Sequence, residues 1–96
     1  MATVYIVNKS SHDFSPAKAY GDIVFLSEGP MNRYSTNNMH RIFSDKMKGC
    51  KAGDYIVPCS LNVMNMIASA LFAFWHGKLN LLLFKNGSYI ERNLVL

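Results

Sequence analysis

Short apolar runs alternate with segments of helical spacing along the chain, and this alternation restricts the fold more than any other feature. Strands separated by helices of this length require right-handed crossovers and a parallel sheet. The last two runs flank Asn86-Gly87, whose positive φ angles suit a type I′ turn and an antiparallel hairpin. The predicted strands are Val4–Val7, Ile23–Leu26, Tyr55–Val57, Leu79–Phe84 and Ser88–Leu96, and the predicted helices are Phe14–Tyr20, Asn37–Cys50 and Leu61–His76.

The same alternation predicts how the elements are layered. The order β-α-β-α-β-α-β-β is typical of an α/β fold with a three-layer, Rossmann-like, mostly parallel sheet and a C-terminal β-hairpin. The chain has 96 residues, half of them hydrophobic. Dividing it would leave two cores too small to be stable, so we expect residues 1–96 to form a single domain.

The helix predicted over Leu61–His76 is almost uncharged, and apolar side chains surround most of its helical wheel. A surface helix normally carries one apolar stripe, so this helix needs cover on nearly every side. The sheet covers one side, and a second copy of the chain would cover another. We therefore expect a homo-oligomer formed through Leu61–Trp75. The alternative is that Ala, Met and Asn side chains on the outer face remain exposed.

Charge and thiol content limit the possible partners and the compartment. Ten basic and six acidic residues give a net charge of +4, which favours an acidic partner such as a nucleotide. The basic residues are scattered, so we do not expect nucleic-acid binding. Cys50 and Cys59 have no nearby His at metal-ligand spacing and suit a reduced, cytoplasmic protein. The N-terminus lacks the form of a signal peptide, and no segment is long enough to span a membrane.

Polar loops are predicted to follow the first three strands. In an open parallel sheet, ligands bind outside the carboxyl ends of the strands, where the strand order reverses. Ser60 is well placed to cap the helix that follows it, and a helix N-terminus attracts phosphate or carboxylate. Arg33 could contact such an anion in a bidentate manner, and Tyr34 could stack on a base. The candidate ligand-binding residues are Asn8, Lys9, Ser10, His12, Asp13, Glu28, Arg33, Ser60 and Asn62.

Catalytic and cofactor motifs are not evident. His12-Asp13 beside several serines invites a hydrolase interpretation, but adjacent residues of one loop seldom form a triad, and no G-x-S-x-G elbow occurs. Cys59 lacks the spacing of a phosphate-binding cysteine loop. Glycine-rich phosphate motifs are absent, which disfavours a tightly held dinucleotide or nucleotide hydrolysis. We therefore expect no catalytic residue, no metal and no cofactor.

Three stretches carry a resemblance to a known group of proteins. They are VYIVNKSSHDFSPAKAYGDIVFLSEG, DYIVPCSLNVMN and HGKLNLLLFKNGSYIERNLVL. Over most of its length the chain resembles a family of small tailed-phage proteins. The resemblance implies a product made in an infected bacterium, and small phage proteins of this kind are often counter-defence factors. Some of these sequester nucleotide immune signals, and others block host enzymes.

The leading hypothesis is a non-enzymatic protein that binds and sequesters a nucleotide-derived anion at the carboxyl ends of the strands. One alternative is an inhibitor that docks on a host enzyme through the third helix or the edge of the hairpin. A weaker alternative is a small nucleotide hydrolase.

Overall fold

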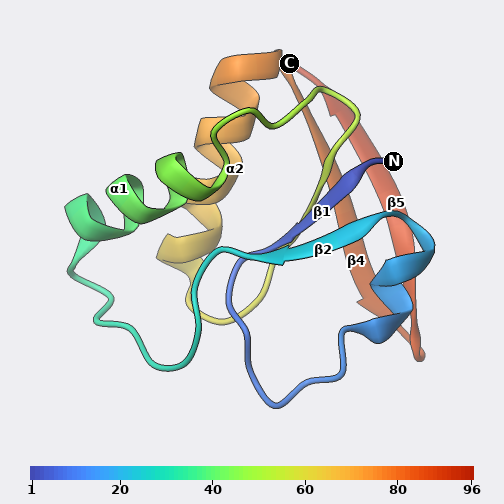
Figure 1. The fold of residues 1–96 in the computed structure, drawn as a ribbon, viewed down its shortest axis with the longest axis horizontal. Helices are drawn as coiled ribbons and strands as arrows, with labels where there is room; N and C mark the ends of the chain where they lie inside the picture. The colour runs from blue at the N-terminus through green and yellow to red at the C-terminus, as the bar shows by residue number, and fades with distance from the viewer.

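A computed structural model describes all residues from Met1 to Leu96 and contains one five-stranded sheet (Figure 1). The strand order is β2-β1-β3-β4-β5, in which β1 is parallel to β2 and β3, β3 is parallel to β4, and β5 is antiparallel to β4. The prediction of an α/β fold with a mostly parallel sheet is therefore confirmed. The elements are β1 (Thr3–Ile6), η1 (Ser15–Ala19), β2 (Asp22–Phe25), α1 (Thr36–Lys46), β3 (Tyr55–Val57), α2 (Asn62–His76), β4 (Lys78–Lys85) and β5 (Ser88–Val95).

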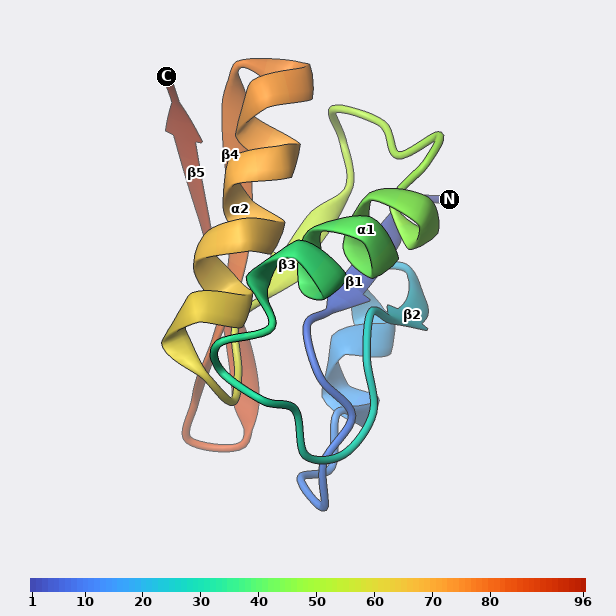
Figure 2. The same ribbon diagram turned by 90° about the vertical axis from the view of Figure 1, so that its left-hand side faces the viewer.

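Both α-helices cover the same face of the sheet, where they lie against each other (Figure 2). On this face Tyr5 and Ile56 pack with Met39 and Phe43 of α1 and with Phe72 of α2. The other face is covered mainly by the short 3₁₀ helix η1. Both faces of the central strands are therefore shielded from water. This explains why the run from Val4 to Val7 is apolar throughout and does not alternate with polar residues.

The layer opposite the α-helices is thinner than the sequence predicts. A helix was expected over Phe14–Tyr20, but the segment forms one 3₁₀ helix of five residues. A helix this short gains few hydrogen bonds for the cost of nucleation, although Pro16 lies in its first turn, where the missing N–H would have no partner inside the helix. Its main anchors are Phe14 and Ala17, which are buried against Val4, Ile6 and Leu82. The chain therefore has two α-helices and one 3₁₀ helix at the places of the three predicted helices.

Two local features set the ends of the sheet. Asn86 and Gly87 both have positive φ and connect β4 to β5, as a type I′ turn requires. At the opposite end, the buried carboxylate of Asp54 accepts the backbone N–H groups of Thr3 (2.9 Å) and Lys51 (2.8 Å). The Asn80 amide donates to the carbonyls of Ala52 and Asp54, at 2.8 and 2.9 Å. Together these bonds join the amino ends of β1, β3 and β4.

No helix of the protein has both the length and the apolar content needed to span a membrane.

Gly21 is predicted to be the glycine that tolerates a side chain least. A Cβ at this position would overlap the carbonyl oxygen of Ala2, which also accepts the backbone N–H of Asp22 at 3.0 Å. We expect Gly21→Ala to lower the free energy of unfolding by about 1–3 kcal/mol, the usual cost of overpacking. Urea denaturation measures this. Gly53→Ala is the matched control, because a Cβ there meets no atom within 4 Å, and equal losses for the two variants would contradict the prediction.

Candidate functional site

The loops that follow β1, β2 and β3 meet at one end of the sheet (lower part of Figure 1). In the order β2-β1-β3, the chain crosses from β1 to β2 on one side and later continues to β3 on the other side of β1. The strand order therefore reverses between β1 and β3, and this is where open α/β sheets form their ligand crevice.

The buried side chain of Asn8 joins the three loops. Its Nδ2 donates to the carbonyl oxygen of Gly29 and to Oγ of Ser60, both at 3.0 Å. Its Oδ1 accepts a hydrogen bond from Oγ of Ser27 at 2.9 Å. Its backbone also contacts Cys59, whose thiol lies 3.3 Å from the Asn8 nitrogen and 3.4 Å from its oxygen. The amide is therefore used inside the protein, and Asn8 positions the loops instead of presenting a free donor to a ligand.

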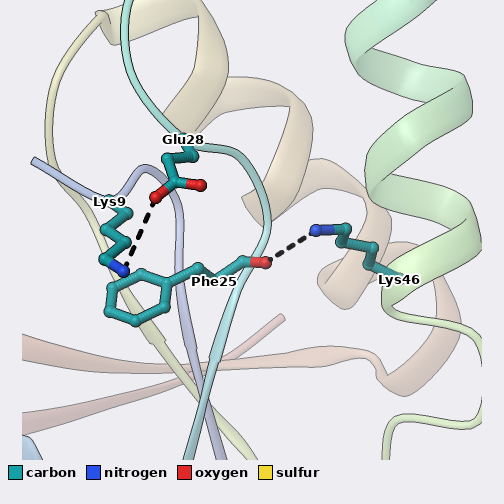
Figure 3. Close-up of polar contacts among 4 residues, drawn as sticks. All are labelled: Lys9, Phe25, Glu28 and Lys46. Carbon is teal, nitrogen blue, oxygen red and sulfur yellow. Dashed lines mark hydrogen bonds and ion pairs between the residues drawn. The ribbon is translucent and has the colours of Figure 1, made fainter.

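Lys9 and Glu28 hold the first two loops side by side (Figure 3). The backbone of Lys9 donates to Ser27 (2.8 Å) and accepts from Gly29 (3.1 Å). Its Nζ lies 3.5 Å from Oε1 of Glu28, and the two side chains are 54% and 73% exposed. An ion pair this exposed contributes at most about 1 kcal/mol. Because Glu28 is also an acid beside the rim, Lys9 adds little net positive charge there.

The same view shows how the second strand is anchored to a helix. Nζ of Lys46, the last residue of α1, donates to the backbone carbonyl of Phe25 at 3.2 Å (Figure 3). The ring of Phe25 also lies below the ammonium group of Lys9, with 5.5 Å between Nζ and the ring centroid. Two lysines are thereby used in fixing the end of β2.

Ser60 does not cap α2, contrary to the sequence prediction. The helix begins at Asn62 with Leu61 as the N-cap residue, and no side chain caps it. Ser60 has a φ of 64°, the left-handed conformation, and its Oγ accepts the Asn8 amide. The first N–H groups of α2 have no partner inside the helix and carry a partial positive charge.

The start of α2 borders a hollow of about 480 Å³. Arg33 and Tyr34, from the loop between β2 and α1, form another side of it. The only ion pair in the chain is that of Lys9 with Glu28, so the Arg33 guanidinium has no acidic partner. The side chain of Tyr34 is 84% exposed. The hollow is lined by Arg33, Tyr34, Ser60, Leu61, Asn62, Val63 and Met66.

A second hollow, of about 460 Å³, adjoins the first and shares Ser60 and Leu61 with it. It is lined by residues of all three loops together with Met64 of α2. The candidate residues Asn8, Lys9 and Ser10 lie here. The structure thus brings six of the nine candidates to the two hollows: these three, Arg33, Ser60 and Asn62. Glu28 lies at the same end of the sheet but lines neither hollow, and its carboxylate faces Lys9.

His12 and Asp13 line neither hollow. The His12 ring packs edge-on against Phe14 and Phe84, with centroid distances of 4.8 and 4.6 Å. Oδ1 of Asp13 accepts the backbone N–H of Ser15 at 2.9 Å, and this bond lowers the pKa of the carboxyl group. Both residues therefore organise the start of η1, on the opposite face of the sheet.

Sequence reasoning missed the apolar part of the site. Leu61, Val63 and Met66 line the first hollow, and Pro30 and Met31 line the second. Apolar residues near a helix start are usually interpreted as core. The spacing along α2 could have indicated Met66, because it lies one helical turn after the candidate residue Asn62 and on the same side of the helix.

The groups that line the two hollows indicate what kind of ligand would suit them. No group of three or more His, Cys, Asp or Glu side chains is placed to hold a metal ion. Burial raises the pKa of the Cys59 thiol, which reduces its thiolate population. The hollows contain cationic and backbone donors, an exposed aromatic ring and apolar side chains, a combination that suits a small anionic ligand with an aromatic part.

Comparison with known proteins gives one match. The model of the family described as Phage Pam3 gp32-like protein matches residues 2–95. No curated protein and no solved structure matches the chain.

We expect Asn8→Ala to lower the free energy of unfolding by about 2–3 kcal/mol, because the Gly29 carbonyl and Ser60 Oγ each lose a partially buried donor. Thermal or urea denaturation measures the loss. Asn93→Ala is the control, since the Asn93 amide makes one exposed bond to Glu91 and its loss should cost at most about 0.5 kcal/mol. Similar losses for both variants would show that Asn8 does not hold the loops together.

Proposed function

The chain belongs to the phage Pam3 gp32-like protein family, and we propose that it binds and sequesters a nucleotide-derived anion, such as a signalling nucleotide of bacterial immunity. The observation that carries the proposal is the hollow at the start of α2. There an unpaired Arg33, an exposed Tyr34 and the first N–H groups of a helix of 15 residues face the same space.

Each part of a nucleotide has a counterpart in this hollow. The phosphate would lie between the Arg33 guanidinium and the backbone N–H groups of Asn62 and Val63, where the helix dipole adds to the attraction. The base would stack on Tyr34, because base–aromatic stacking contributes about 1–3 kcal/mol. Met66 would complete the apolar wall. A volume of about 480 Å³ falls within the usual range of small-molecule sites.

Sequestration agrees better with the geometry than turnover does. Ser60, the one serine that lines the hollow, accepts a hydrogen bond from an amide and has no neighbouring histidine. His12, the one histidine in these loops, packs against aromatic rings on the other side of the sheet. A protein of this kind would release its ligand chemically unchanged, as a phage counter-defence factor acting by sequestration would.

We expect the free chain to bind at least one member of a panel of cyclic dinucleotides and cyclic ADP-ribose products, measured by calorimetry. Arg33→Ala should raise Kd by about 10- to 100-fold, the loss typical of a hydrogen bond to a charged group. Tyr34→Ala should raise Kd by about 5- to 100-fold. Arg92→Ala, which removes an exposed arginine on β5, should leave Kd unchanged.

Two results would count against this proposal. One is the absence of binding to every ligand of the panel, and the other is equal weakening by Arg33→Ala and Arg92→Ala. Chromatography of the ligand after denaturation of the complex distinguishes sequestration from turnover, because sequestration returns the intact nucleotide.

We further propose that two copies of the chain associate through the outer face of α2. Helix α2 contains no Asp, Glu, Lys or Arg, so this face avoids charge repulsion between copies that each carry +4. Phe74 is 84% exposed and Met66 67% exposed. Beside Phe74 lies a hollow of about 440 Å³ between α1 and α2, with Ile67, Ala70 and Leu71 in its wall.

The exposed Phe74 ring and the hollow beside it therefore lie on one surface. In a dimer with two-fold symmetry, Phe74 of each copy could enter the hollow of the partner. The face also contains Met66, which lines the ligand hollow, so a partner would border the bound nucleotide.

We expect the wild-type chain to have twice the monomer mass of 10.8 kDa in light scattering, and Phe74→Glu to have the monomer mass. A buried carboxylate without a partner would disrupt the interface. Val95→Glu is the control, since Val95 is equally exposed on β5. A monomeric wild-type chain would contradict the proposed association.

A further inference from the structure

Cys50 and His76 form a polar pair at the end of the molecule opposite the ligand hollow. Cys50 follows the turn that ends α1, and His76 is the last residue of α2. Sγ of Cys50 lies 3.1 Å from Nε2 of His76. The imidazole is held in place by Phe72, whose ring centroid is 4.7 Å from its own. A thiol within hydrogen-bond reach of an imidazole is the arrangement in which a base activates a sulfur nucleophile.

The thiol borders an open space. Cys50 lines a hollow of about 290 Å³, together with Ser44, Met47, Lys48, Gly49 and Trp75. Lys48 has no acidic partner and could meet a carboxylate of an incoming molecule. Trp75 is partly exposed and supplies an apolar wall. The hollow is too small for a folded partner but has room for part of a small anionic reagent.

Of the titratable groups near Cys50, His76 is the one suited to accept its proton. Burial and the Asp54 carboxylate raise the pKa of the Cys50 thiol, so the thiol is neutral at rest and needs a base to react. Asp54 already accepts two backbone N–H groups. Burial raises the pKa of Tyr5 to about 12, so the phenol remains protonated.

The second thiol provides a contrast within the same molecule. Sγ of Cys59 contacts the backbone nitrogen and oxygen of Asn8, at 3.3 and 3.4 Å, and no histidine. Burial raises the pKa of this thiol as well. The two cysteines therefore share a raised pKa and differ in the base beside the sulfur.

We propose that Cys50 is a modification site at which a small anionic disulfide, of the glutathione disulfide type, exchanges with the thiol while His76 acts as the base. The proton of Cys50 moves to Nε2 of His76, and Sγ attacks one sulfur of the reagent. The reagent's S–S bond breaks as the protein–reagent S–S bond forms. The departing thiolate takes the proton from His76, so one disulfide is consumed, one is formed and one thiol is released. The site is independent of the proposed nucleotide hollow.

The test uses the native full-length chain and oxidised glutathione, with each modified cysteine quantified over time by mass spectrometry. We expect Cys50 to react about tenfold or more faster than Cys59 in the folded protein. The two should react at similar rates in guanidinium chloride, which removes the effect of the fold. His76→Phe keeps a ring beside Phe72 and removes the base, and His76→Gln is a second, polar variant. Both should slow Cys50 by about tenfold or more and leave Cys59 unchanged.

The single-thiol variants Cys50→Ser and Cys59→Ser assign the rates independently of peptide mapping. Faster reaction at Cys59 in the native chain would overturn the proposal. An unchanged Cys50 rate in both His76 variants would also overturn it, because the imidazole would then have no role in the exchange.

Discussion

The amide of Asn8 is the interaction on which the carboxyl end of the sheet depends. Parallel topology brings the ends of β1, β2 and β3 to one edge, but it does not fix how the loops beyond them are arranged. One buried side chain does this, because it donates to Gly29 and Ser60 and accepts from Ser27. The position of Arg33 and Tyr34 beside the start of α2 follows from this arrangement, since Gly29 lies in the same loop.

Helix α2 connects the three proposals. Its first turn faces the hollow that contains Arg33 and Tyr34, and its outer face, with Met66 and Phe74, is apolar and uncharged. Its last residue, His76, lies beside the Cys50 thiol. Because α2 runs antiparallel to the strand it covers, its two ends lie at opposite ends of the sheet. The hollow proposed to bind a nucleotide and the Cys50 thiol are therefore separated by the length of the helix, and each can be altered without touching the other.

Much of the fold could be predicted from the sequence, because it depends on local patterns. Apolar runs indicated the four parallel strands to within a residue or two, Asn86-Gly87 indicated the turn, and Gly77 the end of α2. The prediction of Ser60 as a helix cap was wrong, since its left-handed backbone and its bond to Asn8 depend on a residue 52 positions away. The position of His12 depends in the same way on Phe84, which no local pattern reveals. His12 is close in sequence to Asn8 and Lys9, and for this reason it was predicted to lie in the site. Its ring instead packs against Phe84, away from the two hollows.

The central claim is that a nucleotide-derived anion binds at the start of α2, between Arg33 and Tyr34. The most direct measurement is a titration of the ¹⁵N-labelled chain with the bound member of the cyclic nucleotide panel, followed by amide chemical shifts. We predict the largest shifts at Arg33, Tyr34, Asn62 and Val63, with little change at Cys50 and at the β4–β5 turn. Shifts confined to the amino ends of the strands, or to the outer edge of β5, would contradict the claim.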